Sequence, residues 1–185
     1  MYLGDAQQVL AAMPDESVDC VVTSPPFWGL RDYGTGQWTG SDPTCAHPVR
    51  RRVDGTRCQR CPAVWSDPQY GLEPTLTHYV DRMIGLFEQV RRILTPSGTC
   101  WVNLGDCYSS ASGGAPKGSR PQPGGLRPAR PRAQDVLAPK NLVGVPWRVA
   151  FALQAFGWWL FSGSLRSPNG PDLPVSAVQR PMARQ

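Results

Sequence analysis

A strand that ends in two prolines is the first feature of this sequence that could do chemistry. Ser24, Pro25, Pro26 and Phe27 directly follow a β-branched segment, residues 18–23. Each proline fixes its own φ and holds the residue before it in an extended conformation, so the run should form a rigid loop. Such a loop presents a serine hydroxyl and a backbone carbonyl as hydrogen-bond acceptors, with an aromatic ring beside them.

Two acceptors next to a flat aromatic surface suit the exocyclic amine of a nucleobase. The acceptors would hold the N–H groups of the amine while the base stacks on Phe27. They would also favour the change from planar to tetrahedral nitrogen when that nitrogen attacks a methyl donor. A base held in this way must first leave the helical stack. The alternative interpretation is an ordinary proline-rich turn after a buried strand.

Four residues with metal-binding side chains lie within 17 positions. Cys45 and His47 are followed, after ten intervening residues, by Cys58 and Cys61. Thiolates and an imidazole in this spacing can close a tetrahedral zinc site, and four protein ligands would make the zinc structural. Chance clustering of reduced cysteines is the alternative. The other cysteines lie in or beside predicted strands and are expected to be buried thiols: Cys20, Cys100 and Cys107.

The spacing of apolar residues predicts the helices and strands that must position the loop and the cysteine cluster. Asp5 is a candidate N-cap, and Pro146 and Gly157 mark the beginning and the end of the last predicted helix. A turn is expected at residues 95–98, and residues 29–72 contain no clear periodic element. Helices are predicted at 5–13, 75–94 and 146–156, and strands at 18–23, 99–104 and from 158 onward.

This alternation of helix and strand predicts the α/β class. We expect one central sheet to contain residues 18–23 and 99–104, with helix 75–94 packed on one face. The loop at residues 24–27 would then lie at the carboxyl edge of the sheet, where ligands bind in open α/β sheets.

The composition bounds the remaining possibilities. The 185 residues suit one domain, and the net charge of +5 suits a polyanionic partner. No stretch approaches the roughly 20 apolar residues of a membrane span, and no signal peptide is evident, so a cytoplasmic protein is expected. Residues 109–134 are rich in Ser, Gly, Pro and basic residues and contain no acidic residue. They predict a flexible basic loop, which is either a solvated linker or a contact to the DNA backbone.

Several short motifs follow one another over residues 1–160: Gly4-Asp5, Leu10, residues 14–19, Thr23 through Phe27, residues 71–75, Gly98-Thr99, residues 103–106 and residues 139–148. In this order they resemble the N4-cytosine/N6-adenine DNA methyltransferases of the beta arrangement, of the restriction–modification or phage type. In that family the catalytic block precedes the main cofactor-binding block. The resemblance implies a partial Rossmann-like sheet of an S-adenosylmethionine-dependent enzyme, with double-stranded DNA as its partner.

The same resemblance assigns roles to particular residues. It implies that Ser24, Pro25, Pro26 and Phe27 hold the target amine, with a serine at this position favouring cytosine N4 over adenine N6. It also implies that Asp5 lies near S-adenosylmethionine, whereas a role as helix cap alone is the alternative. The whole chain is expected to be one incomplete catalytic domain with a zinc-knuckle insertion at residues 40–66.

One motif of that family is missing from the sequence. The glycine-rich turn Asp-Pro-Phe-x-Gly-x-Gly does not occur, and the glycine pairs at 113–114 and 124–125 follow no strand. A truncated gene, a frameshift or a split enzyme would each explain this. We therefore expect little or no activity from the chain alone and a second subunit or downstream fragment that supplies the turn. The alternatives are a zinc-containing basic DNA-binding module without catalysis, and an amine methyltransferase acting on RNA or on protein glutamine.

Overall fold

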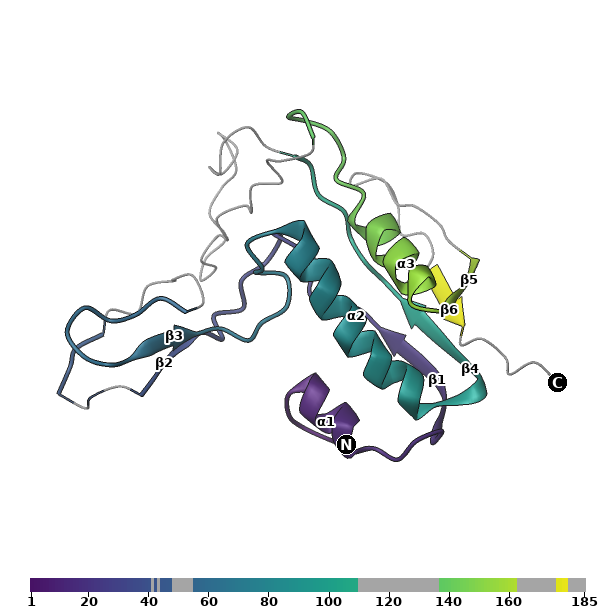
Figure 1. Cartoon of the computed structure of the whole chain (residues 1–185), viewed down its shortest axis with the longest axis horizontal. Helices are drawn as coiled ribbons and strands as arrows, with labels where there is room; N and C mark the ends of the chain where they lie inside the picture. The colour runs from purple at the N-terminus through teal and green to yellow at the C-terminus, as the bar shows by residue number, and fades with distance from the viewer. Residues whose placement is uncertain (41, 43, 48–54, 110–136, 163–175, 180–185) are drawn as a thin grey trace.

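The computed structural model describes residues 1–40, 42, 44–47, 55–109, 137–162 and 176–179 (Figure 1). Helices and strands alternate through most of these residues, which confirms the predicted α/β class. The helices are α1 (Ala6–Ala12), α2 (Leu76–Ile93) and α3 (Val145–Ala155). The strands are β1 (Val18–Thr23), β2 (Gln37–Thr39), β3 (Val64–Ser66), β4 (Leu94–Val102), β5 (Trp159–Ser162) and β6 (Ser176–Gln179).

Four strands form the main sheet, in the order β1-β4-β6-β5. Strands β1 and β4 are parallel, and α2 lies between them in the chain. Strand β6 runs antiparallel to both of its neighbours. The two segments predicted to share one sheet therefore do so. Strands β2 and β3 pair antiparallel in a separate sheet, on an arm that projects away from α2 and the main sheet (Figure 1).

Helices α2 and α3 bury their apolar faces in one core with the main sheet. They pack with Cys100 and Val102 of β4, as predicted for helix 75–94. The buried residues of α2 recur at helical spacing: Tyr79, Met83, Leu86, Phe87, Val90 and Ile93. Those of α3 are Val145, Val149, Ala150 and Leu153.

The opposite face of the main sheet carries exposed apolar side chains. Alternate residues of a strand point to opposite faces, and α2 and α3 lie on the other side of the sheet (Figure 1). The exposed fractions on this open face are 75% for Val22, 40% for Trp101, 51% for Trp159 and 80% for Phe161. Among the described residues, helices therefore cover only one of the two faces of the main sheet.

Cys20 lies on this open face and is exposed, so the expectation that it is buried was wrong. Its neighbour in β1, Val21, faces the core beside Cys100. Burial raises the pKa of the Cys100 thiol to about 12. Cys107 is half-buried. A short β-branched run does not indicate which of its two faces another element covers, and this is why the sequence misplaced Cys20.

The predicted helix ends agree with the structure. The Asp5 carboxylate caps α1 by accepting a hydrogen bond from the backbone N–H of Gln8 at 3.1 Å. Pro146 lies in the first turn of α3, and Gly157 follows the helix with a φ of 86°. Such a positive φ is a conformation that glycine adopts without strain.

Three short strands were not predicted. Strands β2 and β3 lie in the segment 29–72, and β6 lies beyond residue 162. Strands of three or four residues show no measurable period and depend on their partners for stability. The predicted turn at 95–98 belongs to β4, where the pairing with β1 is irregular between Val18 and Cys20.

The predicted basic loop, residues 109–134, lies outside the described residues except for Ser109. Backbone hydrogen bonds join the residues at the two ends of this segment. The N–H of Ser109 donates to the carbonyl of Asn141, and the N–H of Lys140 donates to the carbonyl of Ser109, both at 2.8 Å. Among the residues described, no helix has the length and apolar character needed to cross a membrane.

Candidate functional site

The loop at residues 24–27 begins where β1 ends, at the carboxyl edge of the main sheet. The carbonyl of Thr23 accepts a hydrogen bond from the N–H of Asn103 at 2.9 Å, so the chain leaving β4 lies beside the loop. Ser24 is exposed, Pro25 is buried, and Phe27 is half-buried. The predicted position of the loop at this edge is therefore confirmed.

The inner side of the loop is tied to α2 and to the segment that precedes it. The Tyr79 hydroxyl donates to the carbonyl of Pro26 at 3.1 Å. The indole N–H of buried Trp28 donates to the carbonyl of Glu73 at 3.1 Å. The backbone N–H of Gly29 donates to the carbonyl of Gly71 at 2.8 Å. These three bonds hold the loop and its exit against the core.

Gly71 touches the loop so closely that no other residue would fit. Its φ is +88°, and a Cβ there would lie 2.6 Å from the carbonyl oxygen of Phe27. The N–H of Gly71 donates to the buried carboxylate of Glu73 at 2.8 Å, and Glu73 in turn forms an ion pair at 2.6 Å with the partly exposed Arg82. The guanidinium of Arg82 also lies 4.1 Å from the centroid of the Tyr70 ring.

Gly105 provides a second close contact to the loop. A Cβ at Gly105 would lie 2.5 Å from the Phe27 ring, so the ring rests directly on the backbone of the chain that follows β4. The next residue, Asp106, accepts hydrogen bonds from the N–H groups of Gly144 and Val145 at 2.9–3.0 Å. Asp106 thereby caps α3, whose own N-cap residue is a glycine without a side chain.

Asp5 lies at the start of α1, where its carboxylate is exposed apart from the capping bond. The capping interpretation is confirmed. A contact between Asp5 and S-adenosylmethionine stays a prediction, since the cap leaves part of this acidic group accessible to a ligand.

From the loop, the chain runs out along the arm as two antiparallel segments, residues 29–40 and 55–70. The side chain of Gln69 joins them by accepting from the N–H of Tyr33 at 2.7 Å and donating to the carbonyl of Arg31 at 2.8 Å. Further out, the Thr35 hydroxyl donates to the buried carboxylate of Asp67 at 2.8 Å. The arm is therefore continuous in structure with the loop.

Aromatic rings fill the outer part of the arm. Trp65 is buried and packs over Gly36, where a Cβ would lie 2.3 Å from the indole ring. Trp38 contacts Trp65 edge to face at 5.7 Å and stacks on His47 at 4.8 Å between ring centroids. His47 is thus oriented by the arm itself.

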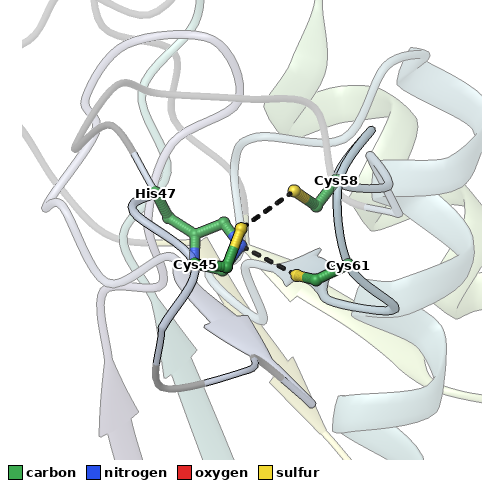
Figure 2. A group of neighbouring side chains, drawn as sticks. All are labelled: Cys45, His47, Cys58 and Cys61. Carbon is green, nitrogen blue, oxygen red and sulfur yellow. Dashed lines mark hydrogen bonds between the residues drawn. The ribbon is translucent and has the colours of Figure 1, made fainter.

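The four predicted metal ligands come together on this arm. Figure 2 shows Cys45 and His47 from one segment facing Cys58 and Cys61 from another. All four ligand atoms lie within 4.8 Å of one another. The Cys45 and Cys58 sulfurs are 3.9 Å apart, and His47 Nε2 lies 3.1 Å from the Cys61 sulfur.

Three cysteine sulfurs and one histidine nitrogen at these separations are a donor set that suits zinc. Around a tetrahedral zinc with three sulfur ligands and one nitrogen ligand, the ligand atoms lie about 3.5–3.8 Å apart, given bonds of about 2.3 Å to sulfur and about 2.0 Å to nitrogen. The N–H of Arg60 donates to the Cys58 sulfur and lowers the pKa of that thiol to about 6. Partial burial and the neighbouring thiols raise the pKa of Cys45 to about 11. A lowered pKa favours the thiolate of Cys58, and the thiolate is the form of cysteine that can bind zinc.

A family model of DNA methylases (N6_N4_Mtase) matches residues 18–165 of this chain. The chain belongs to this DNA methylase family. The match includes the loop at residues 24–27, the arm with its cysteine cluster, and helices α2 and α3. The resemblance inferred from the sequence motifs is confirmed.

This DNA methylase chain has relatives among the Type II methyltransferases. It is 37% identical over 182 residues to M.Cfr9I of Citrobacter freundii, a match that covers 98% of this chain and 50% of that protein. It is also 37% identical to M.SmaI of Serratia marcescens, over 98% of this chain and 51% of the relative. The chain thus spans about half the length of these curated relatives.

The solved structures of two proteins are similar to this DNA methylase chain. A Thermus thermophilus protein described as a DNA modification methylase is 17% identical, with a TM-score of 0.49 over 99% of this chain and 54% of that one. The cytosine-N4-specific PvuII DNA methyltransferase is 19% identical, with a TM-score of 0.43 over 97% of this chain and 47% of that one.

The sequence did not reveal which residues of the DNA methylase chain contact the inner side of the loop at residues 24–27. Gly71, Glu73 and Gly105 were noted only within the motifs at residues 71–75 and 103–106, and Tyr79 only as part of the predicted helix 75–94. The position of Gly105 shortly after a strand that ends at the same edge was the one signal that could have placed it near the loop. Tyr79 had no such signal, because its contact with Pro26 spans 53 residues.

Proposed function

We propose that this DNA methylase chain forms the base-binding part of an enzyme that transfers a methyl group from S-adenosylmethionine to the exocyclic amine of a base in double-stranded DNA. The observation that carries this proposal is the exposed Ser24 on a two-proline loop at the carboxyl edge of the sheet. The inner side of that loop is bonded to α2, which keeps its outer side in one position. We place the enzyme in the cytoplasm, where its thiols would stay reduced.

The hydrogen bonds of the loop indicate which acceptors remain for a substrate. The carbonyls of Pro26 and Phe27 already accept hydrogen bonds from protein groups. Within the described part of the chain, no donor reaches the carbonyl of Pro25. We assign the exposed Ser24 hydroxyl and the Pro25 carbonyl as the two acceptors for the target amine.

The chain's own residues then hold and orient the base. When bound, S-adenosylmethionine supplies an activated methyl group. The acceptors at Ser24 and Pro25 attract the N–H groups of the amine and favour the tetrahedral nitrogen of the transition state. Phe27 stacks on the flipped base, and the backbone of Gly105 supports its ring from one side.

A serine rather than an aspartate before the proline pair favours cytosine N4 as the methylated atom. A reconstituted enzyme, in which this chain is joined to the part of M.Cfr9I that it does not match, tests the function directly. Incubated with S-adenosylmethionine and duplex DNA, it is expected to produce N4-methylcytosine, measured by mass spectrometry of the digested nucleosides. Full-length M.Cfr9I controls for the assay. N6-methyladenine would overturn the choice of base, and binding to DNA without any methylated nucleoside would overturn the catalytic function.

The cofactor requires residues that the 185-residue sequence does not contain. S-adenosylmethionine sites of this kind use a glycine-rich turn, and none follows a strand here. We propose that a further polypeptide segment supplies this turn and packs on the open face of the main sheet, where Val22, Trp101 and Phe161 are exposed. Asp5 would lie near the bound cofactor. The chain alone is then expected to methylate DNA weakly or not at all.

We propose that the insertion at residues 40–66 binds one structural zinc through Cys45, His47, Cys58 and Cys61. Support comes from the convergence of the four ligand atoms and from the stacking of Trp38 on His47. Elemental analysis of the purified chain is expected to find about one zinc per chain. A metal-free protein in which all three thiols react freely with a thiol reagent would contradict this proposal.

A zinc-containing module that binds DNA without catalysis is the second candidate. The absence of the glycine-rich turn from the sequence favours it. The reconstituted enzyme separates the two functions, because only a methyltransferase yields a methylated nucleoside.

A further inference from the structure

The hydroxyl of Tyr79 lies in an unusual place for a polar group. Tyr79 is fully buried, and its ring is part of the apolar core beneath the main sheet. Its hydroxyl reaches out of that core to the base-binding loop and donates to the carbonyl of Pro26 at 3.1 Å. Burial raises the pKa of the Tyr79 phenol, so this group stays protonated and remains a donor. It is therefore suited to hold a fixed acceptor and not to accept or release a proton.

The hydrogen bond from the Tyr79 hydroxyl restricts a backbone angle of the loop that the two proline rings do not fix. Pro25 and Pro26 fix their own φ angles through their rings. The ψ angle of Pro26, which decides where its carbonyl points, is not fixed by the ring. Holding that carbonyl toward α2 removes this remaining freedom. Along an extended chain, the groups of successive residues point in different directions. Because the carbonyl of Pro26 points inward, toward α2, it helps to direct the Ser24 side chain outward.

We propose that Tyr79 is a positioning residue for methyl transfer: its hydroxyl fixes the direction of the Pro26 carbonyl and thereby aims Ser24 and the Pro25 carbonyl at the target amine. This inference rests on the proposed function of the loop. Tyr79 touches neither base nor cofactor and acts through the loop alone.

The substitution Tyr79→Phe tests this proposal, because it removes the hydroxyl and keeps the ring in the core. Tyr70→Phe is the matched control: Tyr70 is also buried, and within the described residues its hydroxyl reaches no hydrogen-bond partner. Hydrogen–deuterium exchange of the chain itself is the first measurement. In Tyr79→Phe, the amides of residues 27–30 are expected to exchange about tenfold faster, as the loss of one buried hydrogen bond implies. The amides of β4 and α3 should be unchanged, as should all amides in Tyr70→Phe.

The exchange pattern distinguishes positioning from general stability. Unchanged exchange at residues 27–30, or a rise that is equal in β4 and α3, would overturn the proposal, since a purely structural tyrosine would affect the whole core. In the reconstituted enzyme, Tyr79→Phe is expected to lower kcat about tenfold with little change in the KM for DNA. An unchanged kcat would also overturn it. If the wild-type reconstituted enzyme methylates no base, the proposed function fails, while the exchange measurement still decides whether Tyr79 orders the loop.

Discussion

Replacing Ser24 with alanine is expected to slow methyl transfer by the reconstituted enzyme roughly 30- to 1000-fold, equivalent to about 2–4 kcal/mol of transition-state stabilisation. The hydroxyl of Ser24 is exposed at the end of β1 and would act mainly on the amine as its nitrogen becomes tetrahedral. The affinity for DNA should therefore change little. Single-turnover methylation rates and DNA-binding measurements on the same preparation separate the two effects.

Ser97→Ala serves as the matched control, because Ser97 is also exposed but lies near the start of β4, at the opposite end of the strand from the loop. Phe27→Ala is expected to weaken DNA binding as well as turnover, since stacking on a flipped base contributes about 1–3 kcal/mol. If Ser24→Ala methylates as fast as the parent enzyme, the role assigned to this hydroxyl is wrong. A loss of DNA binding in Ser24→Ala equal to the loss of rate would instead indicate a ground-state contact.

Cys58→Ser is expected to abolish zinc binding and to unfold the outer arm while the main sheet stays folded. Structural zinc contributes on the order of 10 kcal/mol to the folding of small zinc-finger peptides. The outer arm has little other support: β2 and β3 are three residues long, and among the described residues of 37–66 the only buried aromatic side chain is Trp65. The main core around α2 and α3 contains none of the four ligands.

The near-ultraviolet circular dichroism of the arm tryptophans reports this change, because Trp38 stacks on the ligand His47. Cys20→Ser is the matched control, since Cys20 is an exposed thiol of β1 outside the cluster. Zinc content measured together with exchange at residues 55–66 should show both losses in Cys58→Ser and neither in Cys20→Ser. An arm that keeps its order without metal would show that the aromatic packing alone is sufficient.

Local rules of the sequence were enough to predict the serine–proline loop, the long helix beside it and the four clustered side chains, but not strands β2 and β3 of the arm. The helix at residues 75–94 followed from the period of its apolar residues, and the cap at Asp5 followed from its place before the first helix. The loop after β1 followed from the geometry of consecutive prolines, which holds in any surroundings. The spacing of the cysteines and His47 likewise predicted a cluster that the structure brings together.

Other features depended on contacts between residues far apart in the chain. Asp106 caps a helix that begins 39 residues later, and the contact from Tyr79 to Pro26 spans 53 residues. Neither the period of a helix nor the preference of a residue for a cap reveals such a partner, because each describes only neighbours in sequence. The sequence by itself thus determined that a serine–proline loop follows β1 and that Cys45, His47, Cys58 and Cys61 form a cluster of possible metal ligands. Only the packing of α2 and of the chain after β4 around the loop decided how it is held, since the direction of a carbonyl depends on which donor the fold places next to it.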